Sequence, residues 1–264
     1  MQARSGSEEE TPASSGGGVT SAARRVAGRA LGGVRAVRRP IESWIIDSSE
    51  VGPGPFLEPD AFAWVGALEA GHGVVRSELE ALLAADVERQ STHDMNAAAS
   101  IRADRWETIL LHYYGMDCGV AARCPGTIAL LGDIPGLRAA SFSILWPGAT
   151  IPPHRGPYAG VVRYHLAVVV PEPADGCGIR VGDEVGHWEE GRSLLFDESY
   201  EHEAWNRTGG MRAVLFLDIV RPLRQPARAV NAAALAAFAV SPYARSTKRR
   251  NRAWESEQGL VGPA

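Results

Sequence analysis

The chain has 264 residues, of which 45% are hydrophobic and 22% charged, and its formal net charge is −4. This composition allows one full hydrophobic core, and the slightly acidic balance excludes the basic character that is typical of nucleic-acid-binding domains. The three cysteines form no CxxC pair, no apolar run approaches the roughly 20 residues that cross a bilayer, and no secretory signal is visible, so we expect a cytoplasmic protein without a disulfide framework.

The N-terminal 40 residues have two parts of different composition. Residues 1–18 are rich in Ser, Gly and Glu, which predicts disorder because such a segment buries too little apolar surface to offset its ordering entropy. Residues 19–39 place six arginines among Ala, Val and Leu and predict a basic amphipathic helix. We assign residues 1–40 to a disordered, basic arm. A membrane-surface contact through residues 19–39 is the less favoured role of this arm, and a solvated helix is the favoured one.

Residues 41–240 have the periodic patterns of a folded domain. Apolar residues recur at helical spacing from Phe56 to Ala85, and the glycines around His72 divide this segment into two helices that we expect to pack outside a sheet. A strand is predicted to start at Trp106, and CPGTIALLGDIPG predicts a short helix and a turn. The basic segment 241–264 is predicted to be a flexible tail.

Beyond Ala139 the pattern changes to short strands that alternate with Gly, Pro and Asp turns. This pattern predicts an antiparallel sandwich or barrel with flanking helices rather than a βαβ fold. The predicted strands are SFSILW, VVRYHLAVVV, CGIRVG, VGHWE, SLLFD, HEAWN and MRAVLFLDIV. Because side chains alternate between the two faces of a strand, we expect Arg163, His165, Ala167 and Val169 to share one face.

Arginines inside these apolar strands need an explanation. Alternation places Arg212 on one face with Val214 and Phe216. A buried guanidinium is costly unless it meets an anion, which predicts that Arg212 binds the carboxylate of a ligand. The structural alternative is that Arg163 and Arg212 are buried as ion pairs with Asp197 or Asp218.

Two histidines far apart in the chain, His154 and His202, are candidate metal ligands. Non-haem Fe(II) oxygenases bind iron through two histidines and one carboxylate, with the first histidine and the acid spaced as His-x-Asp or His-x-Glu. Here Gly156 occupies the position of the acid. Arg212 follows His202 by ten residues and strengthens the interpretation, because the tail of 2-oxoglutarate needs a cation. The competing interpretation is a pair of histidines in a β-rich domain that binds no metal.

Four segments between about Trp106 and Leu223 resemble the aspartyl/asparaginyl β-hydroxylases. They are CPGTIALLGDIPG, FSILWPGATIPPHRGPYAGVVRYHLAVVVP, CGIRVGDEVGHWEEGRSLLFDESYEHEAWN and RAVLFLDIVRPL. The resemblance implies a double-stranded β-helix, which is a jelly-roll or cupin-like barrel, and the cofactors Fe(II) and 2-oxoglutarate with O2 as co-substrate. It also accounts for Gly156, since some members of the family have glycine there and bind iron through two histidines.

The resemblance implies a role for eight residues. The iron ligands would be His154 and His202. The residues that line the co-substrate pocket would be Trp106, Ser143, Arg163, His165 and Arg212. Ser143 and Arg212 would bind the carboxylate remote from the metal, while Arg163 could instead hold an acidic group of the substrate. Glu198 matches a family position, usually an aspartate, where an acid bonds metal-bound water.

The implied reaction is hydroxylation of an unactivated carbon. We expect it to be the β-carbon of an aspartyl or asparaginyl side chain in a protein, peptide or small molecule. The alternatives are a lipid acyl-chain hydroxylase of the same family and a catalytically inactive barrel that acts as a binding module. A zinc-dependent hydrolase ranks last, because a third protein ligand is missing.

Overall fold

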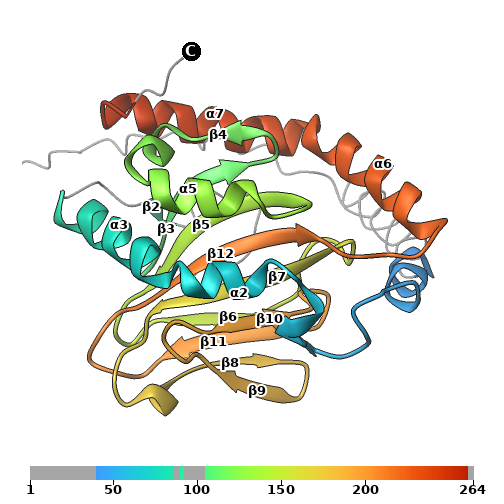
Figure 1. Cartoon of the computed structure of the whole chain (residues 1–264), viewed down its shortest axis with the longest axis horizontal. Helices are drawn as coiled ribbons and strands as arrows, with labels where there is room; N and C mark the ends of the chain where they lie inside the picture. The colour runs from blue at the N-terminus through green and yellow to red at the C-terminus, as the bar shows by residue number, and fades with distance from the viewer. Residues whose placement is uncertain (1–39, 86–89, 92–104, 261–264) are drawn as a thin grey trace, which may run out of the picture. The chain divides into compact units, whose positions relative to one another are not determined.

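A computed structural model describes residues 40–85, 90–91 and 105–260, and the chain divides into two units, Met1–Ile41 and Glu42–Ala264. The arm predicted for residues 1–40, with its membrane contact through residues 19–39, therefore lies outside the described residues except for its last residue. The second unit contains every strand of the described structure (Figure 1). Within the described residues, no helix combines the length and the apolar character needed to cross a membrane.

Two antiparallel sheets form the frame of this unit. The large sheet has the order β1-β10-β7-β12-β5-β3-β2, with β4 paired to β3. Its strands are β1 (Phe56–Leu57), β2 (Gln90–Ser91), β3 (Trp106–Tyr113), β4 (Met116–Asp117), β5 (Leu137–Leu145), β7 (Val161–Val169), β10 (Ser193–Phe196) and β12 (Arg212–Val220). The small sheet has the order β6-β11-β8-β9, and its strands are β6 (Thr150–His154), β8 (Cys177–Val181), β9 (Glu184–His187) and β11 (His202–Asn206).

The chain passes back and forth between the two sheets from β5 to β12. Strands β5, β7, β10 and β12 belong to the large sheet, whereas β6, β8, β9 and β11 belong to the small one. This alternation is the topology of a double-stranded β-helix. The predicted fold class, mainly β with flanking helices, is confirmed.

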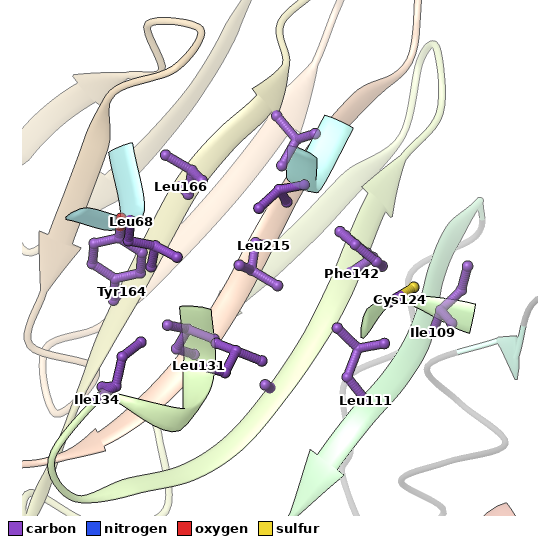
Figure 2. Close-up of a cluster of buried hydrophobic side chains, with 14 of the residues drawn as sticks. Leu68, Ile109, Leu111, Cys124, Leu131, Ile134, Phe142, Tyr164, Leu166 and Leu215 are labelled. Carbon is purple, nitrogen blue, oxygen red and sulfur yellow. The ribbon is translucent and has the colours of Figure 1, made fainter. Parts of the chain in front are cut away.

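The helices flank the sheets (Figure 1). They are η1 (Pro59–Ala61), α2 (Val65–Ala70), α3 (His72–Ala84), η2 (Gly119–Arg123), α5 (Pro125–Gly132), η3 (Ala174–Gly176), α6 (Ala227–Ala239) and α7 (Pro242–Glu257). The main core lies between the large sheet and the helices α2, α3 and α5, where Leu68 and Leu131 meet Phe142, Tyr164 and Leu215 (Figure 2). The two predicted helices between Phe56 and Ala85 thus pack outside the sheet, as expected.

A second core fills the space between the two sheets. Val214 of β12 and Ala167 of β7 belong to it, whereas their neighbours Leu215 and Leu166 face the helices. The alternation predicted for these strands is therefore confirmed at these positions. Val169 is an exception, because a bulge in the pairing of β7 with β12 turns it toward the helical side.

One prediction about local structure was wrong, and one strand was not predicted. The segment predicted to be a flexible tail forms α7 over residues 242–257. Ser241 caps this helix, and its buried side chains include Glu255, which accepts a hydrogen bond from the Gly119 amide at 2.6 Å. The strand β6 was not predicted, because it contains Pro152 and Pro153. Two prolines are tolerated there because β6 is an edge strand of the small sheet.

Candidate metal and co-substrate site

The two candidate iron ligands lie side by side. His154 ends β6 and His202 begins β11, and these residues are direct partners in the antiparallel pairing of the two strands. Their ring centroids are 4.1 Å apart. The pairing of two strands therefore brings together two imidazoles that are far apart in the chain.

Hydrogen bonds to the backbone fix the tautomer of both rings. His154 Nδ1 donates to the Pro152 carbonyl at 2.8 Å, and His202 Nδ1 donates to the Tyr200 carbonyl at 3.0 Å. A carbonyl oxygen only accepts, so each proton sits on Nδ1 and each lone pair on Nε2. Neither Nε2 has a protein partner within the described part of the chain. This is the arrangement that most metal-binding histidines show.

Both imidazoles are held in the neutral form that a metal ligand requires. Burial, together with the nearby Arg163 and His154, lowers the pKa of His202 to about 3. Burial also lowers the pKa of His154 below its usual value, although its bond to the Pro152 carbonyl acts in the opposite direction. At neutral pH neither ring is protonated, so a divalent cation would meet no competing proton.

Glu198 fills the space beside Gly156, where a third ligand would originate. A Cβ atom at position 156 would lie 2.2 Å from the Cδ atom of Glu198. Among the described residues, no group of three or more His, Cys, Asp or Glu side chains is arranged to hold a metal. The site therefore offers two histidines, which agrees with the two-histidine set that the resemblance implied.

Arg163 is already paired with acidic side chains. It forms ion pairs with Glu198 and, at 3.1 Å, with Asp218, and its guanidinium lies 4.4 Å from the centroid of the Phe216 ring. Burial raises the pKa of Glu198 to about 7 despite Arg163, and the nearby Asp218 and Asp197 act in the same direction as burial. The ion-pair alternative thus holds for Arg163 with Asp218. Its role in co-substrate binding stays a prediction, as does the bond from Glu198 to a metal-bound water.

Arg212 is a buried cation without a carboxylate partner among the described residues. It is 1% exposed, and its Nη1 donates to the Ser143 carbonyl at 3.2 Å while its Nε has no partner. The guanidinium lies 4.4 Å from the centroid of the Trp188 ring. Burial lowers its pKa to about 10, so it stays protonated at neutral pH. The ion-pair alternative does not hold for Arg212, and its binding of an anionic ligand stays a prediction.

Ser143 and Trp106 lie next to Arg212. The Trp106 indole N–H donates to the Ser143 hydroxyl at 3.0 Å. Because this hydroxyl accepts from Trp106 and has no acceptor of its own among the described residues, its proton can be donated to a ligand. The Ser143 hydroxyl and the Arg212 guanidinium are therefore a pair of neighbouring donors suited to a carboxylate.

His165 supplies a third donor without a partner. Its Nδ1 accepts from the Trp188 indole at 3.3 Å, so the proton is on Nε2, which is buried and has no partner in the described structure. Its ring lies against Phe196 and Phe216. Burial, with the charges of Arg212 and Arg163 nearby, keeps the pKa of His165 well below its usual value. His165 is thus a neutral donor in largely apolar surroundings.

The residues present fit iron and a dicarboxylate such as 2-oxoglutarate. The groups that could bind a ligand are two ring nitrogens with free lone pairs, the Arg212 cation, whose bonds are to neutral groups, and two neutral donors. The resemblance assigned roles to all of these residues but gave none to Trp188. Trp188 contacts both Arg212 and His165. No pattern in the sequence indicates this, because Trp188 follows the end of β9 and its contacts depend on how the sheets pack.

A buried ion pair connects the loops that flank the two histidines. Arg221 Nη2 and Asp197 Oδ2 are 2.6 Å apart, and both side chains are at most 2% exposed. Arg221 also donates through Nε to the carbonyl of Ala159, in the loop after His154, at 2.7 Å. Asp197 accepts from the Ser199 amide at 2.9 Å, in the loop before His202. This pair therefore connects the loop after His154 with the loop before His202.

Comparisons with known proteins agree with this geometry. The family model for aspartyl/asparaginyl beta-hydroxylase matches residues 69–222. The ornithine lipid ester-linked acyl 2-hydroxylase of Rhizobium tropici is 40% identical over 219 residues, which are 82% of this chain and 78% of that protein. The human aspartyl/asparaginyl beta-hydroxylase is 38% identical over 107 residues, which are 39% of this chain but only 14% of that relative.

A solved Pseudomonas putida prolyl-4-hydroxylase is 19% identical over 57% of this chain and 87% of that chain, with a TM-score of 0.35. The stretch that matches the family model is more than half of the sequence. It includes the positions of both histidines, Ser143, Arg163, His165, Glu198 and Arg212. The chain belongs to the aspartyl/asparaginyl β-hydroxylase family and is an enzyme of the 2-oxoglutarate-dependent hydroxylase type.

Proposed function

We propose that this enzyme uses Fe(II) and 2-oxoglutarate to hydroxylate the carbon next to the carbonyl group in an acyl chain of an amino-acid-containing lipid. The observation that supports this choice is the extent of the similarity to the Rhizobium tropici ornithine lipid ester-linked acyl 2-hydroxylase, which spans 82% of the chain and most of that relative. The similarity to the human aspartyl/asparaginyl beta-hydroxylase is confined to 39% of the chain.

The residues of the site have separate tasks in this proposal. His154 and His202 would hold the iron through Nε2, and Arg212 with Ser143 would bind the carboxylate of 2-oxoglutarate remote from the metal. His165 would donate a hydrogen bond from its Nε2–H group to the same co-substrate. When bound, iron with 2-oxoglutarate and O2 supplies the oxidising power, and the overall reaction converts R–H, 2-oxoglutarate and O2 into R–OH, succinate and CO2.

The protein's own contribution is orientation and exclusion of water. Trp188, Phe196 and Phe216 surround His165, so the co-substrate would bind against an apolar wall. In such surroundings each hydrogen bond to a carboxylate is stronger than in water. No general base or nucleophile is needed, because the metal centre would perform the chemistry.

A second candidate substrate is an aspartyl or asparaginyl side chain, as expected from the sequence. The relatives named aspartyl/asparaginyl beta-hydroxylase favour it. The two candidates share one chemical feature. The β-carbon of aspartate and the 2-position of an acyl chain are both methylene groups next to a carbonyl carbon. A site that presents such a methylene to iron could serve either, so the surroundings of the site must choose between them.

An inactive barrel that acts as a binding module is less well supported. A barrel without catalytic function gains nothing from a buried arginine that lacks a carboxylate partner in the described structure, because the unpaired charge destabilises the fold. The two histidines would likewise be replaceable.

Mass spectrometry tests the proposal. The purified full chain is incubated with Fe(II), 2-oxoglutarate and O2, and either with ornithine lipid dispersed in detergent or with a peptide that contains aspartate and asparagine. We expect a gain of one oxygen on the 2-position of the acyl chain, matched by succinate. The same product without 2-oxoglutarate, or oxygen gained by the peptide alone, would contradict the lipid assignment.

A further inference from the structure

We propose that the outer surfaces of α6 and α7 form a docking surface for a lipid bilayer that contains anionic lipids. The choice of a bilayer as the partner rests on the proposed function, while the surface itself is defined by exposed residues of the described chain. The docking surface includes none of the residues 19–39 of the predicted arm.

Helix α6 exposes an almost wholly apolar surface. Only Ala227, Asn231 and Leu235 of this helix are buried, along a single stripe. Arg228 is its one charged residue, and Val230 is 45% exposed, while Val240 just beyond its end is 65% exposed. A surface helix of a globular protein normally presents charged or polar residues to solvent. The composition of α6 indicates that a partner covers it.

An exposed tryptophan lies close to the start of α6. Ile45, in the helix formed by residues 40–47, packs with Leu223 and Ala227. The neighbouring Trp44 is 37% exposed. Among the residues of Glu42–Ala264 that the structure describes, five large hydrophobic residues are exposed, and three of them are Trp44, Val230 and Val240. Tryptophan is enriched where proteins meet the interfacial region of a bilayer.

Helix α7 supplies positive charge next to this apolar surface. Arg245, Arg249 and Arg252 are exposed and are spaced as i, i+4 and i+7, so they share one face of the helix. None of them has an acidic partner among the residues that the structure describes. Helix α7 carries five basic and two acidic residues, although the whole chain has a net charge of −4. A local cationic face on an acidic protein is complementary to anionic lipid.

The arrangement of the two helices relates this surface to the metal site. Helices α6 and α7 follow one another on the side of the unit remote from β8 and β9 (Figure 1). On α6, Asn231 Nδ2 donates to the Gly160 carbonyl at 2.8 Å. Gly160 belongs to the loop that follows His154, and Arg221 binds the same loop at Ala159. A bilayer that contacts α6 would thus lie next to the loop that borders the iron ligand.

Vesicle co-sedimentation of the full chain tests this inference. Vesicles of phosphatidylcholine mixed with phosphatidylglycerol are compared with vesicles of phosphatidylcholine alone. We expect binding to the anionic vesicles that weakens about fivefold for each of Arg245→Gln, Arg249→Gln and Arg252→Gln. The double variant Val230→Asp/Val240→Asp should lose binding. All variants retain residues 1–39, so any contribution of that arm is the same in each.

Two matched controls lie on the small sheet. Val185 on β9 is 54% exposed, and Arg207, which follows β11, is also exposed. We expect Val185→Asp and Arg207→Gln to bind vesicles as the parent does. Thermal unfolding and the uncoupled conversion of 2-oxoglutarate into succinate should be unchanged in every variant, which separates loss of docking from loss of folding.

Three outcomes would overturn the inference. The first is parental vesicle binding by the Val230→Asp/Val240→Asp and arginine variants. The second is equal loss of binding in the small-sheet controls. The third is absence of vesicle binding together with a dimer, detected by sedimentation, that these substitutions dissociate. Failure of the proposed function would give a different result. The protein would still bind vesicles through α6 and α7 but would hydroxylate no lipid in detergent, so only the proposed substrate would be wrong.

Discussion

Glu198 occupies the space that any side chain at position 156 would need. A Cβ atom at Gly156 would lie 2.2 Å from Cδ and 2.5 Å from Cγ of Glu198. Glu198 is 1% exposed, is paired with Arg163, and accepts the Gly156 amide through its backbone carbonyl at 2.7 Å. The third ligand position of a His-x-Asp site is therefore filled by a neighbouring carboxylate.

Restoring the usual acid at position 156 should therefore damage the protein. Gly156→Asp is expected to lower the free energy of unfolding by about 1–3 kcal/mol, because the new side chain overlaps a buried one that cannot move freely. Removing the obstacle in the double variant Gly156→Asp/Glu198→Ala should recover part of this loss. Chemical denaturation of the metal-free proteins measures both effects.

The comparison depends on Glu198→Ala alone as the reference. If the destabilisation by Gly156→Asp is the same with and without Glu198, the two side chains do not compete for one space, and the steric interpretation is wrong. A control substitution at another glycine needs both open space and an ordinary backbone conformation. Gly148 is unsuitable, because a Cβ there would meet no atom within 4 Å but its φ of +78° would strain any side chain. Gly209, with open space and no positive φ, is the suitable control.

Arg212 should destabilise the protein until its ligand is bound. Arg212→Met removes a buried charge that has no carboxylate partner in the described structure, and we expect it to raise the free energy of unfolding by about 1–3 kcal/mol. The same substitution should abolish the stabilisation that 2-oxoglutarate gives to the parent. Denaturation with and without 2-oxoglutarate measures both effects.

Arg163→Met is the matched control for this prediction. Arg163 is paired with the buried Glu198 and the partly exposed Asp218, so its loss leaves both carboxylates without their cation. We expect it to destabilise the protein by about 3–5 kcal/mol. A stabilising Arg163→Met or a strongly destabilising Arg212→Met would show that the two arginines have been assigned the wrong roles.

Loss of either iron ligand should stop turnover. We expect His154→Ala and His202→Ala to abolish production of succinate from 2-oxoglutarate and to lose binding of Fe(II), because each would remove one of the two proposed protein ligands. His187→Ala is the control, since His187 is an exposed histidine of the small sheet whose Nδ1 donates to the Cys177 carbonyl at 3.0 Å. Succinate formed at the parental rate by either ligand variant would refute the metal assignment.

The depressed pKa of His202 predicts how the metal-free protein responds to acid. The unfolded chain binds a proton at this residue near the ordinary histidine value of 6.5, whereas the folded state does so only near 3. Between these values the unfolded state holds more protons, so stability falls as the pH is lowered from about 6.5. By pH 4 the loss attributable to His202 should be about 3 kcal/mol.

Glu198 acts in the opposite direction and must be separated from His202. Its pKa is raised to about 7 in the folded state, so its contribution to stability increases as the pH falls from about 7 toward its ordinary value of 4.5. Comparing the parent with His202→Gln cancels this contribution, which both proteins share. The difference in free energy of unfolding between the two should move in favour of the variant as the pH falls from 6.5 to 4. A constant difference would contradict the assignment.

The sequence alone was sufficient for the repeating features of the fold. Alternation along VVRYHLAVVV and MRAVLFLDIV predicted which residues of β7, and which of β12, share a face, because side chains of a strand point to opposite faces in turn. It erred where local rules compete with packing. Strand β6 was not predicted because it contains two prolines, which are tolerated at the edge of a sheet. A bulge turned Val169 to the other face of β7.

The prediction of a flexible C-terminal tail was wrong for a related reason. Its basic residues resemble those of a solvated tail, but Ala244, Thr247, Asn251 and Glu255 recur along one face of α7 and are buried. Small and polar side chains give a weak amphipathic signal, so only the partner surface shows that this helix is packed.

The sequence pattern identified three imidazoles and two guanidiniums of the site, and the resemblance added the Ser143 hydroxyl and assigned the roles. Only the tertiary structure decided that Arg163 is neutralised by Glu198 and Asp218 while Arg212 is buried without a carboxylate partner among the described residues. The physical reason is that the charge balance of a buried group depends on which side chains the packing of distant strands brings within a few ångströms, and neither spacing nor composition specifies this.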